Sequence, residues 1–94
     1  MWVDQQRPIA VSDLVRTREL DDDLVVYHCG TDLVSHLDPI ARIVWESLAS
    51  RPTFAELVAQ LSDRFHTDRD QIATDVSALL DELLASELIE LVAR

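Results

Sequence analysis

The junction Leu37-Asp38-Pro39 constrains the fold of this chain more than any other feature, because an apolar β-type run ends there and a helix begins. Asp38 can accept hydrogen bonds from the free N–H groups of a first helical turn. Pro39 has no N–H to leave unpaired, and its backbone angle already suits a helix. The junction therefore predicts a strand that leads directly into a helix over about residues 39–50, which Arg51-Pro52 ends.

Apolar runs before this junction predict an antiparallel sheet. β-Branched and aliphatic residues fill about residues 11–20, and the acidic turn Asp21-Asp22-Asp23 separates them from a second run at 24–28. Gly30 follows, where a turn can need a positive φ, and a third run covers 33–37. Such turns between apolar runs are typical of hairpins. We therefore expect a three-stranded meander with one exposed edge.

Two more helices follow, each with a start signal and an apolar stripe at helical spacing. Thr53 and Glu56 have the spacing of a capping box and open a helix over about residues 53–65. Asp68, with Gln71 three residues on, opens the last helix. The predicted fold class is α+β, a three-stranded antiparallel β-meander followed by three α-helices in a winged-helix-like arrangement. We expect residues 1–94 to form a single domain, with a loose lead-in at 1–10.

The last helix has a wider apolar arc than one core contact requires in so small a domain. The arc consists of Ile72, Ala73, Val76, Leu79, Leu80, Leu83 and Leu84. In one interpretation, part of this arc faces a partner. In the other, Leu79 packs inside with most of the arc, while Leu80 and Leu84 cover the sheet or the C-terminal segment 88–92. The pattern alone leaves both interpretations open.

The charge of the chain argues against nucleic-acid binding. Eighteen acidic residues stand against eight arginines, which gives a formal net charge of −10. Such a field repels phosphate backbones, and the last helix, where a winged helix would contact DNA, is itself strongly acidic. The surface instead favours a neutral or basic protein partner.

Catalytic and metal-ligating patterns are weak. His28 and Cys29 are neighbours in a predicted strand, so their side chains should point to opposite faces. His36 and His66 do not have the spacing of metal ligands, and a chain with one glycine has no Gly-rich phosphate loop. We expect no catalytic residue, no metal and no cofactor. The lone cysteine excludes an intramolecular disulfide. No segment resembles a signal peptide or a membrane span, so a cytoplasmic protein is the simplest expectation.

The order of these parts resembles the PqqD-like family, also called RiPP recognition elements, which serve ribosomal peptide modification pathways. The resemblance covers about residues 14–90. It rests on the hairpin, the strand-to-helix junction, the capping box and the Asp75-Val76 pair followed by the leucine run. The family commonly has glycine after the first helix and near the end of the third, where this chain has Ser50-Arg51 and Ser86-Glu87.

The resemblance implies binding of the leader segment of a ribosomally made precursor peptide. In similar proteins the leader adds as a strand to the third β-strand and lies in a groove against the third helix. The residues expected to bind it are Leu33, Val34, Ser35 and His36 on the strand, and Arg69, Ile72, Ala73, Val76 and Leu80 on the helix. Which face of the strand turns toward the helix stays open at this point.

A free-standing domain of this length resembles two kinds of family member. One is the leader-binding partner of the proteases of lasso-peptide biosynthesis, and the other is the peptide chaperone of pyrroloquinoline quinone biosynthesis. The hairpin is more similar to the lasso type, which implies that the chain does no chemistry and presents the precursor to a separate cysteine protease before a cyclase closes the ring. Two other classes stay open, a winged-helix regulator and a self-association domain that uses the same apolar helix face.

Overall fold

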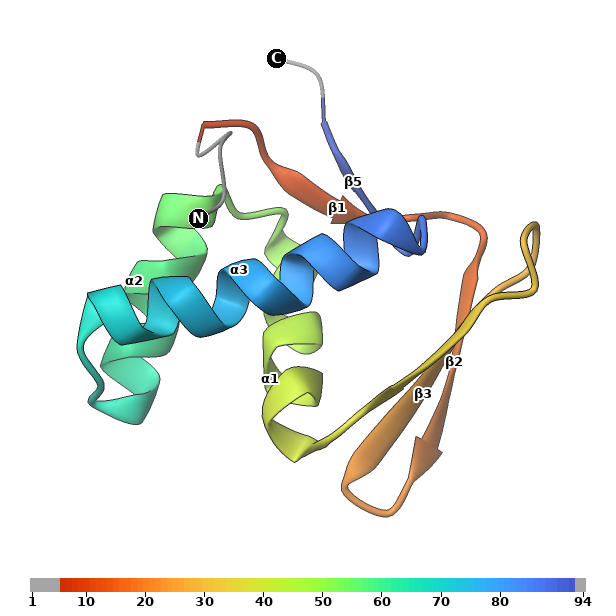
Figure 1. Ribbon diagram of the computed structural model, residues 1–94, viewed down its shortest axis with the longest axis horizontal. Coiled ribbons are helices and arrows are strands. Elements are labelled where there is room, and N and C mark those ends of the chain that lie inside the picture. The colour runs from red at the N-terminus through yellow and green to blue at the C-terminus, as the bar shows by residue number, and fades with distance from the viewer. Residues whose placement is uncertain (1–5, 93–94) are drawn as a thin grey trace.

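Figure 1 shows the computed structural model of the chain, which describes residues 6–92. This part forms five strands, three α-helices and one 3₁₀ turn. The elements in chain order are β1 (Ile9–Val11), β2 (Val15–Leu20), β3 (Asp23–His28), β4 (Val34–Leu37), α1 (Pro39–Ser47), the 3₁₀ turn η1 (Leu48–Ser50), α2 (Phe54–Phe65), α3 (Arg69–Ala85) and β5 (Ile89–Leu91). The α+β class is confirmed, with an antiparallel meander β2-β3-β4 followed by three helices.

The N-terminal segment differs from the prediction. The expected strand over about 11–20 is divided, because Ser12 closes a turn in which its hydroxyl accepts from the N–H of Leu14. Residues before this turn form β1, which pairs with β5 in a separate two-stranded sheet. The loose lead-in at 1–10 is therefore wrong for Ile9 and Ala10, which are buried because β1 lies against the core. Residues 1–5 of that lead-in lie outside the described residues.

Non-glycine residues take the positive φ in both turns of the meander, the first of them within the predicted acidic turn. Asp21 has a positive φ of 57° in the first turn, and Asp32 has one of 62° in the second. Gly30, expected to take this role, does not have a positive φ. Its N–H donates to Nδ1 of the buried His28, and a Cβ at Gly30 would lie 3.0 Å from the His28 ring. The glycine therefore permits a close approach to a side chain.

The helices begin where the sequence predicts. The Asp38 carboxylate accepts from the N–H of Ala41 at 2.8 Å, and Thr53 and Glu56 form a complete capping box. Asp68 occupies the position before α3 but makes no capping hydrogen bond with its side chain. Gln71 donates instead to Asp75, one helical turn further on.

At two helix ends, non-glycine residues take the backbone conformation for which the family commonly uses glycine. Arg51 follows η1 with a φ of 52°, and Glu87 follows α3 with a φ of 59°. Both residues lie in the left-handed region, which glycine adopts without a steric cost from Cβ. The chain therefore keeps the backbone shape that glycine would favour at these ends, at a modest cost in stability.

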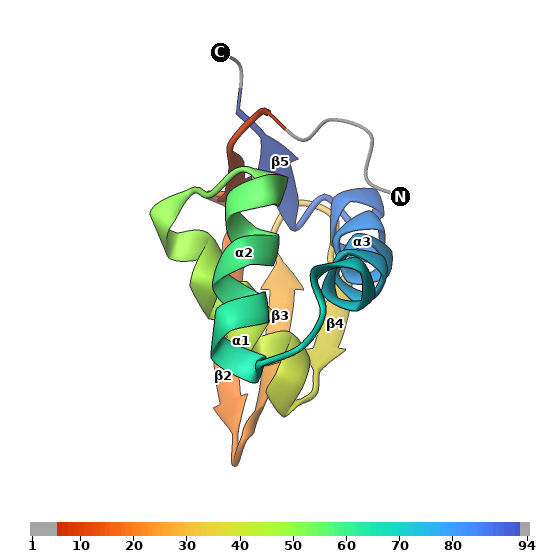
Figure 2. The ribbon, with the colours of Figure 1, turned by 90° about the vertical axis from the view of Figure 1, so that its left-hand side faces the viewer.

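The helices lie on one side of the meander, with α1 against it and α2 farther away, and the other face of the meander is open (Figures 1 and 2). The core lies between the sheet and the helices. Its most buried side chains include Val26 from the sheet, Leu48, Leu57 and Leu61 from the first helices, and Leu80 and Leu83 from α3. No helix within residues 6–92 is both long enough and apolar enough to cross a membrane.

Candidate functional site

Strand β4 forms one edge of the meander. The strand order is β2-β3-β4, so within the described part of the chain nothing pairs with the outer side of β4. Val34, its first residue, is 60% exposed. An unpaired edge presents a row of backbone N–H and C=O groups that can pair with another chain. This edge was the main feature that the sequence predicted for peptide binding.

The register between β3 and β4 determines which β4 side chains face the helices. Leu24 and Val26 of β3 are buried on the helix side of the sheet. Their partners across the ladder are Leu37 and Ser35, and directly opposed residues share a face. Ser35 and Leu37 therefore face the helices, whereas Val34 and His36 lie on the open face. This answers the question that the sequence left open.

The hydrogen-bond pattern determines which backbone groups point outward. The N–H of His28 donates to the carbonyl of Leu33 at 2.9 Å, across from it in the ladder. In antiparallel pairs such bonded positions alternate, so Ser35 and Leu37 also bond to β3. The N–H and C=O groups of Val34 and His36 must then point to the free edge. The N–H of Cys29 donates to Leu14 on the other side of β3, as the same alternation requires.

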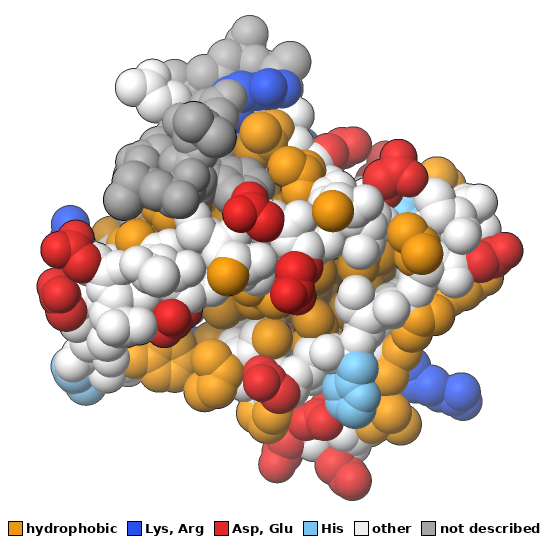
Figure 3. All heavy atoms as spheres, viewed as in Figure 1, with side chains coloured by type: hydrophobic (Ala, Val, Ile, Leu, Met, Phe, Trp, Pro, Cys, Tyr) orange, Lys and Arg blue, Asp and Glu red, His pale blue; other side chains and the backbone are white. Residues whose placement is uncertain are grey.

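An apolar groove runs beside this edge. It consists of two adjoining hollows, which share Asp38, Ala41 and Leu79. The larger hollow, of about 500 Å³, lies between α1, α2 and α3. The smaller lies between β4 and α3 and includes Ser35 and Glu82. Figure 3 shows hydrophobic side chains in the hollowed part of this face and acidic side chains around them.

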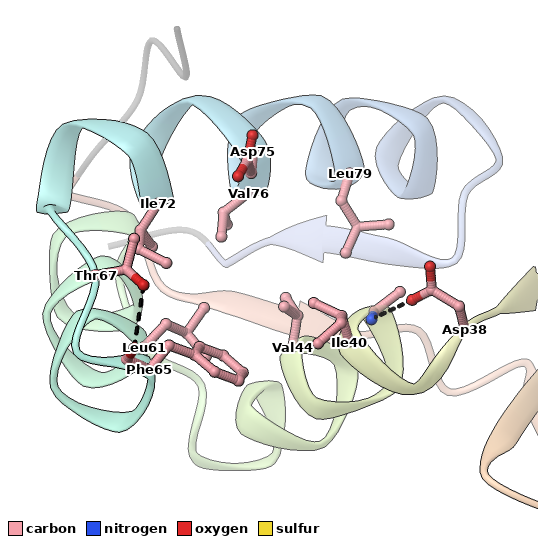
Figure 4. A pocket seen from close by; sticks show the side chains of 11 residues that line it. Asp38, Ile40, Val44, Leu61, Phe65, Thr67, Ile72, Asp75, Val76 and Leu79 are labelled. Carbon is pink, nitrogen blue, oxygen red and sulfur yellow. Dashed lines mark hydrogen bonds between the residues drawn. The ribbon is translucent and has the colours of Figure 1, made fainter.

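The floor of the larger hollow is made by three helices whose side chains converge (Figure 4). Ile72, Val76 and Leu79 point down from α3, Ile40 and Val44 point up from α1, and Leu61 and Phe65 close one end from α2. Asp38 lies at the end nearest β4, and Asp75 lies on α3 at the rim. Ile40 is 59% exposed, so much of the apolar surface is open to solvent.

The structure divides the predicted site residues into groups. The lining of the groove contains Ser35, His36, Ile72 and Val76. Leu33 and Val34 are exposed near the start of the edge. Ala73 packs against the core, and Leu80 is fully buried and lines neither hollow. Arg69 is exposed at the first turn of α3, outside both linings.

The packing interpretation of the α3 arc does not hold in full. Leu80 belongs to the core, whereas Leu79 is half-buried and lines both hollows, so the roles expected for these two leucines are exchanged. Ile40 and Phe65 were missed as site residues. Each belongs to the apolar stripe of its helix, but a stripe does not show which of its members another helix leaves uncovered.

Hydrogen bonds fix both ends of β4. On the open face His36 pairs with Asp23 at 2.6 Å. The Tyr27 hydroxyl donates to Asp32 in the turn before β4, and this bond raises the pKa of Tyr27 above its ordinary value. Both contacts support the strand that forms the border of the groove, and His36 itself borders the smaller hollow.

The groups considered for catalysis or metal binding do not converge. His28 is buried and Cys29 is exposed, on opposite sides of the sheet as predicted. The His28 ring accepts the N–H groups of Gly30 and Thr31 at Nδ1, which is a structural role. Within residues 6–92, no three His, Cys, Asp or Glu side chains are placed to hold a metal ion.

Comparisons with known proteins agree with this geometry. The family model described as Coenzyme PQQ synthesis protein D (PqqD) matches residues 23–89, from β3 through α3 to β5, and the chain belongs to this family. The predicted resemblance to PqqD-like proteins is thereby confirmed.

Among solved structures, TbiB1 in complex with the TbiA(beta) leader peptide is similar to this chain. The two structures have a TM-score of 0.78 and 27% sequence identity, and the match covers 90% of this chain and 99% of that one. No curated protein sequence matches the chain.

Proposed function

We propose that this chain binds the leader segment of a precursor peptide, which adds as a strand to β4 and places side chains in the groove. The observation that carries the proposal is the unpaired edge of β4 beside a groove whose larger hollow, between the three helices, is lined mainly by apolar side chains. In this mode of recognition the backbone edge supplies affinity and the pockets supply selectivity. The similar protein TbiB1 was solved with a leader peptide bound.

The geometry assigns separate roles to the residues of the site. Val34 and His36 offer backbone N–H and C=O groups to the incoming strand, since those groups point away from β3. Side chains of the peptide that face the helices would meet Leu79 and, deeper in the groove, Ile40 and Val76. Alternate residues of a strand point to opposite faces, so about every second peptide side chain would enter the groove.

This role requires no chemistry from the chain itself. We infer that it presents the bound precursor to a separate cysteine protease, and that a cyclase acts afterwards, as in the lasso-type systems that it resembles. The quinone-cofactor chaperone is the alternative within the family, and it differs in the peptide bound. The experiment must therefore use peptides from the chain's own genomic surroundings.

The test is a fluorescence-polarisation titration of the protein against leader segments encoded beside its gene, with a scrambled leader as reference. Saturable binding at micromolar or lower concentration, with clear preference over the scrambled peptide, is expected. Equal binding of both peptides would contradict the proposal. A mass in solution that rises with protein concentration would then favour self-association, and binding to random DNA at low salt would favour the winged-helix alternative.

A further inference from the structure

The groove combines an apolar floor with a rim of uncompensated negative charge. Three carboxylates lie along it: Asp75 borders the larger hollow, Asp38 borders both hollows, and Glu82 borders the smaller. Among the arginines of residues 6–92, none lines either hollow. Figure 4 shows Asp75 midway along the larger hollow on α3 and Asp38 at its end nearest β4, where the smaller hollow with Glu82 begins.

Within residues 6–92, none of these carboxylates forms an ion pair. The Asp38 carboxylate accepts only the backbone N–H of Ala41, and Asp75 accepts from the neutral amide of Gln71. Arg42, one helical turn from Asp38, is directed to the hairpin and pairs there with Glu19. The arginine nearest to Asp38 along the chain is therefore paired with another carboxylate and does not neutralise the groove.

We propose that the groove selects peptides in which a Lys or Arg stands on the same face as an apolar anchor residue, so that the cation meets the rim while the anchor fills the floor. The inference rests on the proposed function and adds the chemistry of the preferred peptide. Charge complementarity at a rim discriminates between partners even where it adds little total affinity. A leader with acidic groove-facing residues is disfavoured by the same field.

Strand geometry makes the inference specific to position. Side chains at positions i and i+2 of an extended peptide share a face, and those at i+1 point the other way. A Lys two residues from an anchor therefore lies along the rim, whereas a Lys one residue from it points away from the groove. Shifting the cation by one position preserves the composition and net charge of the peptide, which provides a matched control.

The experiment uses the leader segment of the titration above, with Lys, Gln or Glu introduced in turn at each position. At groove-facing positions we expect Lys to bind roughly two- to five-fold more tightly than Gln, and Glu to bind more weakly. At the alternate positions the three peptides should bind alike. The Lys preference should shrink as salt rises, since these partly exposed charges are screened.

Protein variants then test whether the rim is responsible. Asp38→Asn, Asp75→Asn and Glu82→Gln remove the charge and preserve shape, and Asn still serves as a helix cap at position 38. Combining them should abolish the Lys preference, so that the Lys and Gln peptides bind the triple variant alike. Asp81→Asn, at an exposed acidic residue on α3 outside both hollows, changes the net charge by one unit, as each single rim substitution does, and should leave the preference intact.

The outcomes separate this inference from the proposed function. Equal affinity for the Lys, Gln and Glu peptides, or a Lys preference that survives the triple substitution, would overturn the inference alone, provided that the parent leader binds. A parent leader that binds no better than its scrambled form would overturn the proposed function and this inference with it.

Discussion

The two edges of the meander are built differently, although β2 and β4 flank the same central strand. At the β2 edge, Arg42 of α1 connects the strand to the helix, through ion pairs with Glu19 and Glu46 and a donated bond to the carbonyl of Asp23. At the β4 edge, the space between strand and helix is an open hollow that adjoins the apolar hollow between the three helices. Charged side chains border the space at the β2 edge, whereas the groove beside β4 leads to apolar side chains.

This difference indicates which edge is suited to pairing. Charged side chains on an edge strand discourage another chain from adding to it, and β2 carries Arg16, Arg18 and Glu19, all exposed. Strand β4 carries no Arg, Asp or Glu. A sheet with two equivalent edges could bind a peptide at either edge. Charged side chains on β2 therefore restrict binding to β4.

The largest predicted effect is on the free energy of unfolding, and it tests whether Leu80 belongs to the core behind the groove. Leu80→Ala should lower the free energy of unfolding by about 2–5 kcal/mol, because a fully buried leucine leaves a cavity. Leu84→Ala, at a position 36% exposed, should cost much less. Urea unfolding of both variants provides the measurement. Similar costs would contradict the assignment of Leu80 to the core.

A charge in the groove should abolish binding without unfolding the protein. Ile40→Asp places a carboxylate on the apolar floor, which a bound peptide would have to desolvate, so we expect at least about a tenfold loss of affinity. The exposed position in the first turn of α1 tolerates an acidic residue.

The matched control is Leu14→Asp, at an apolar residue 53% exposed beside β2. Titration of both variants with the leader, together with circular dichroism, compares the two sides directly. Weakening of binding by Leu14→Asp to the same extent would indicate that the groove is not the site.

Proline substitutions compare the two edges as backbone templates. Val34→Pro removes an N–H that points outward from β4, and should weaken leader binding by roughly two- to tenfold through loss of one hydrogen bond. Thr17→Pro removes an outward N–H from β2, by the alternation that the Cys29–Leu14 bond establishes, and should leave binding unchanged. Proline is tolerated at edge positions of this kind. Equal losses would show that the β4 edge has no special role.

The smallest effect concerns the turn before β4. Tyr27→Phe removes the bond to Asp32, so the turn and the start of β4 should be less protected against hydrogen exchange, while β2 should not change. The pKa of Tyr27 is raised in the folded state, so this bond stabilises the protein at pH values below about 10 and the contribution is lost as pH rises through the folded-state pKa. Thermal unfolding between neutral and alkaline pH should show this loss in the wild type and not in Tyr27→Phe.

Local signals accounted for most of the secondary structure. The strand-to-helix junction at Asp38 and the capping box at Thr53 lie where the sequence places them, because a helix start depends on side chains within one turn of it. The family resemblance placed the edge at the third strand of the meander, because the order of the elements can be predicted from local signals along the chain.

The separation of β1 from β2 could not be predicted from the sequence. β1 has only three residues, all apolar, so it shows no alternation of apolar and polar side chains. Its pairing with β5 joins residues from opposite ends of the chain. Such a contact depends on where the core brings the termini together, and no local pattern encodes it.

The sequence by itself determined the class of fold, the starts of α1 and α2, the opposite orientations of His28 and Cys29, and the excess of apolar surface on α3. The tertiary structure decided which β4 side chains face the groove and that Leu79, not Leu80, lines it. It also decided that Arg42 pairs with Glu19 at the other edge. The physical reason is range. Helix caps and strand alternation depend on neighbours along the chain, whereas burial and register depend on which distant element occupies the remaining space.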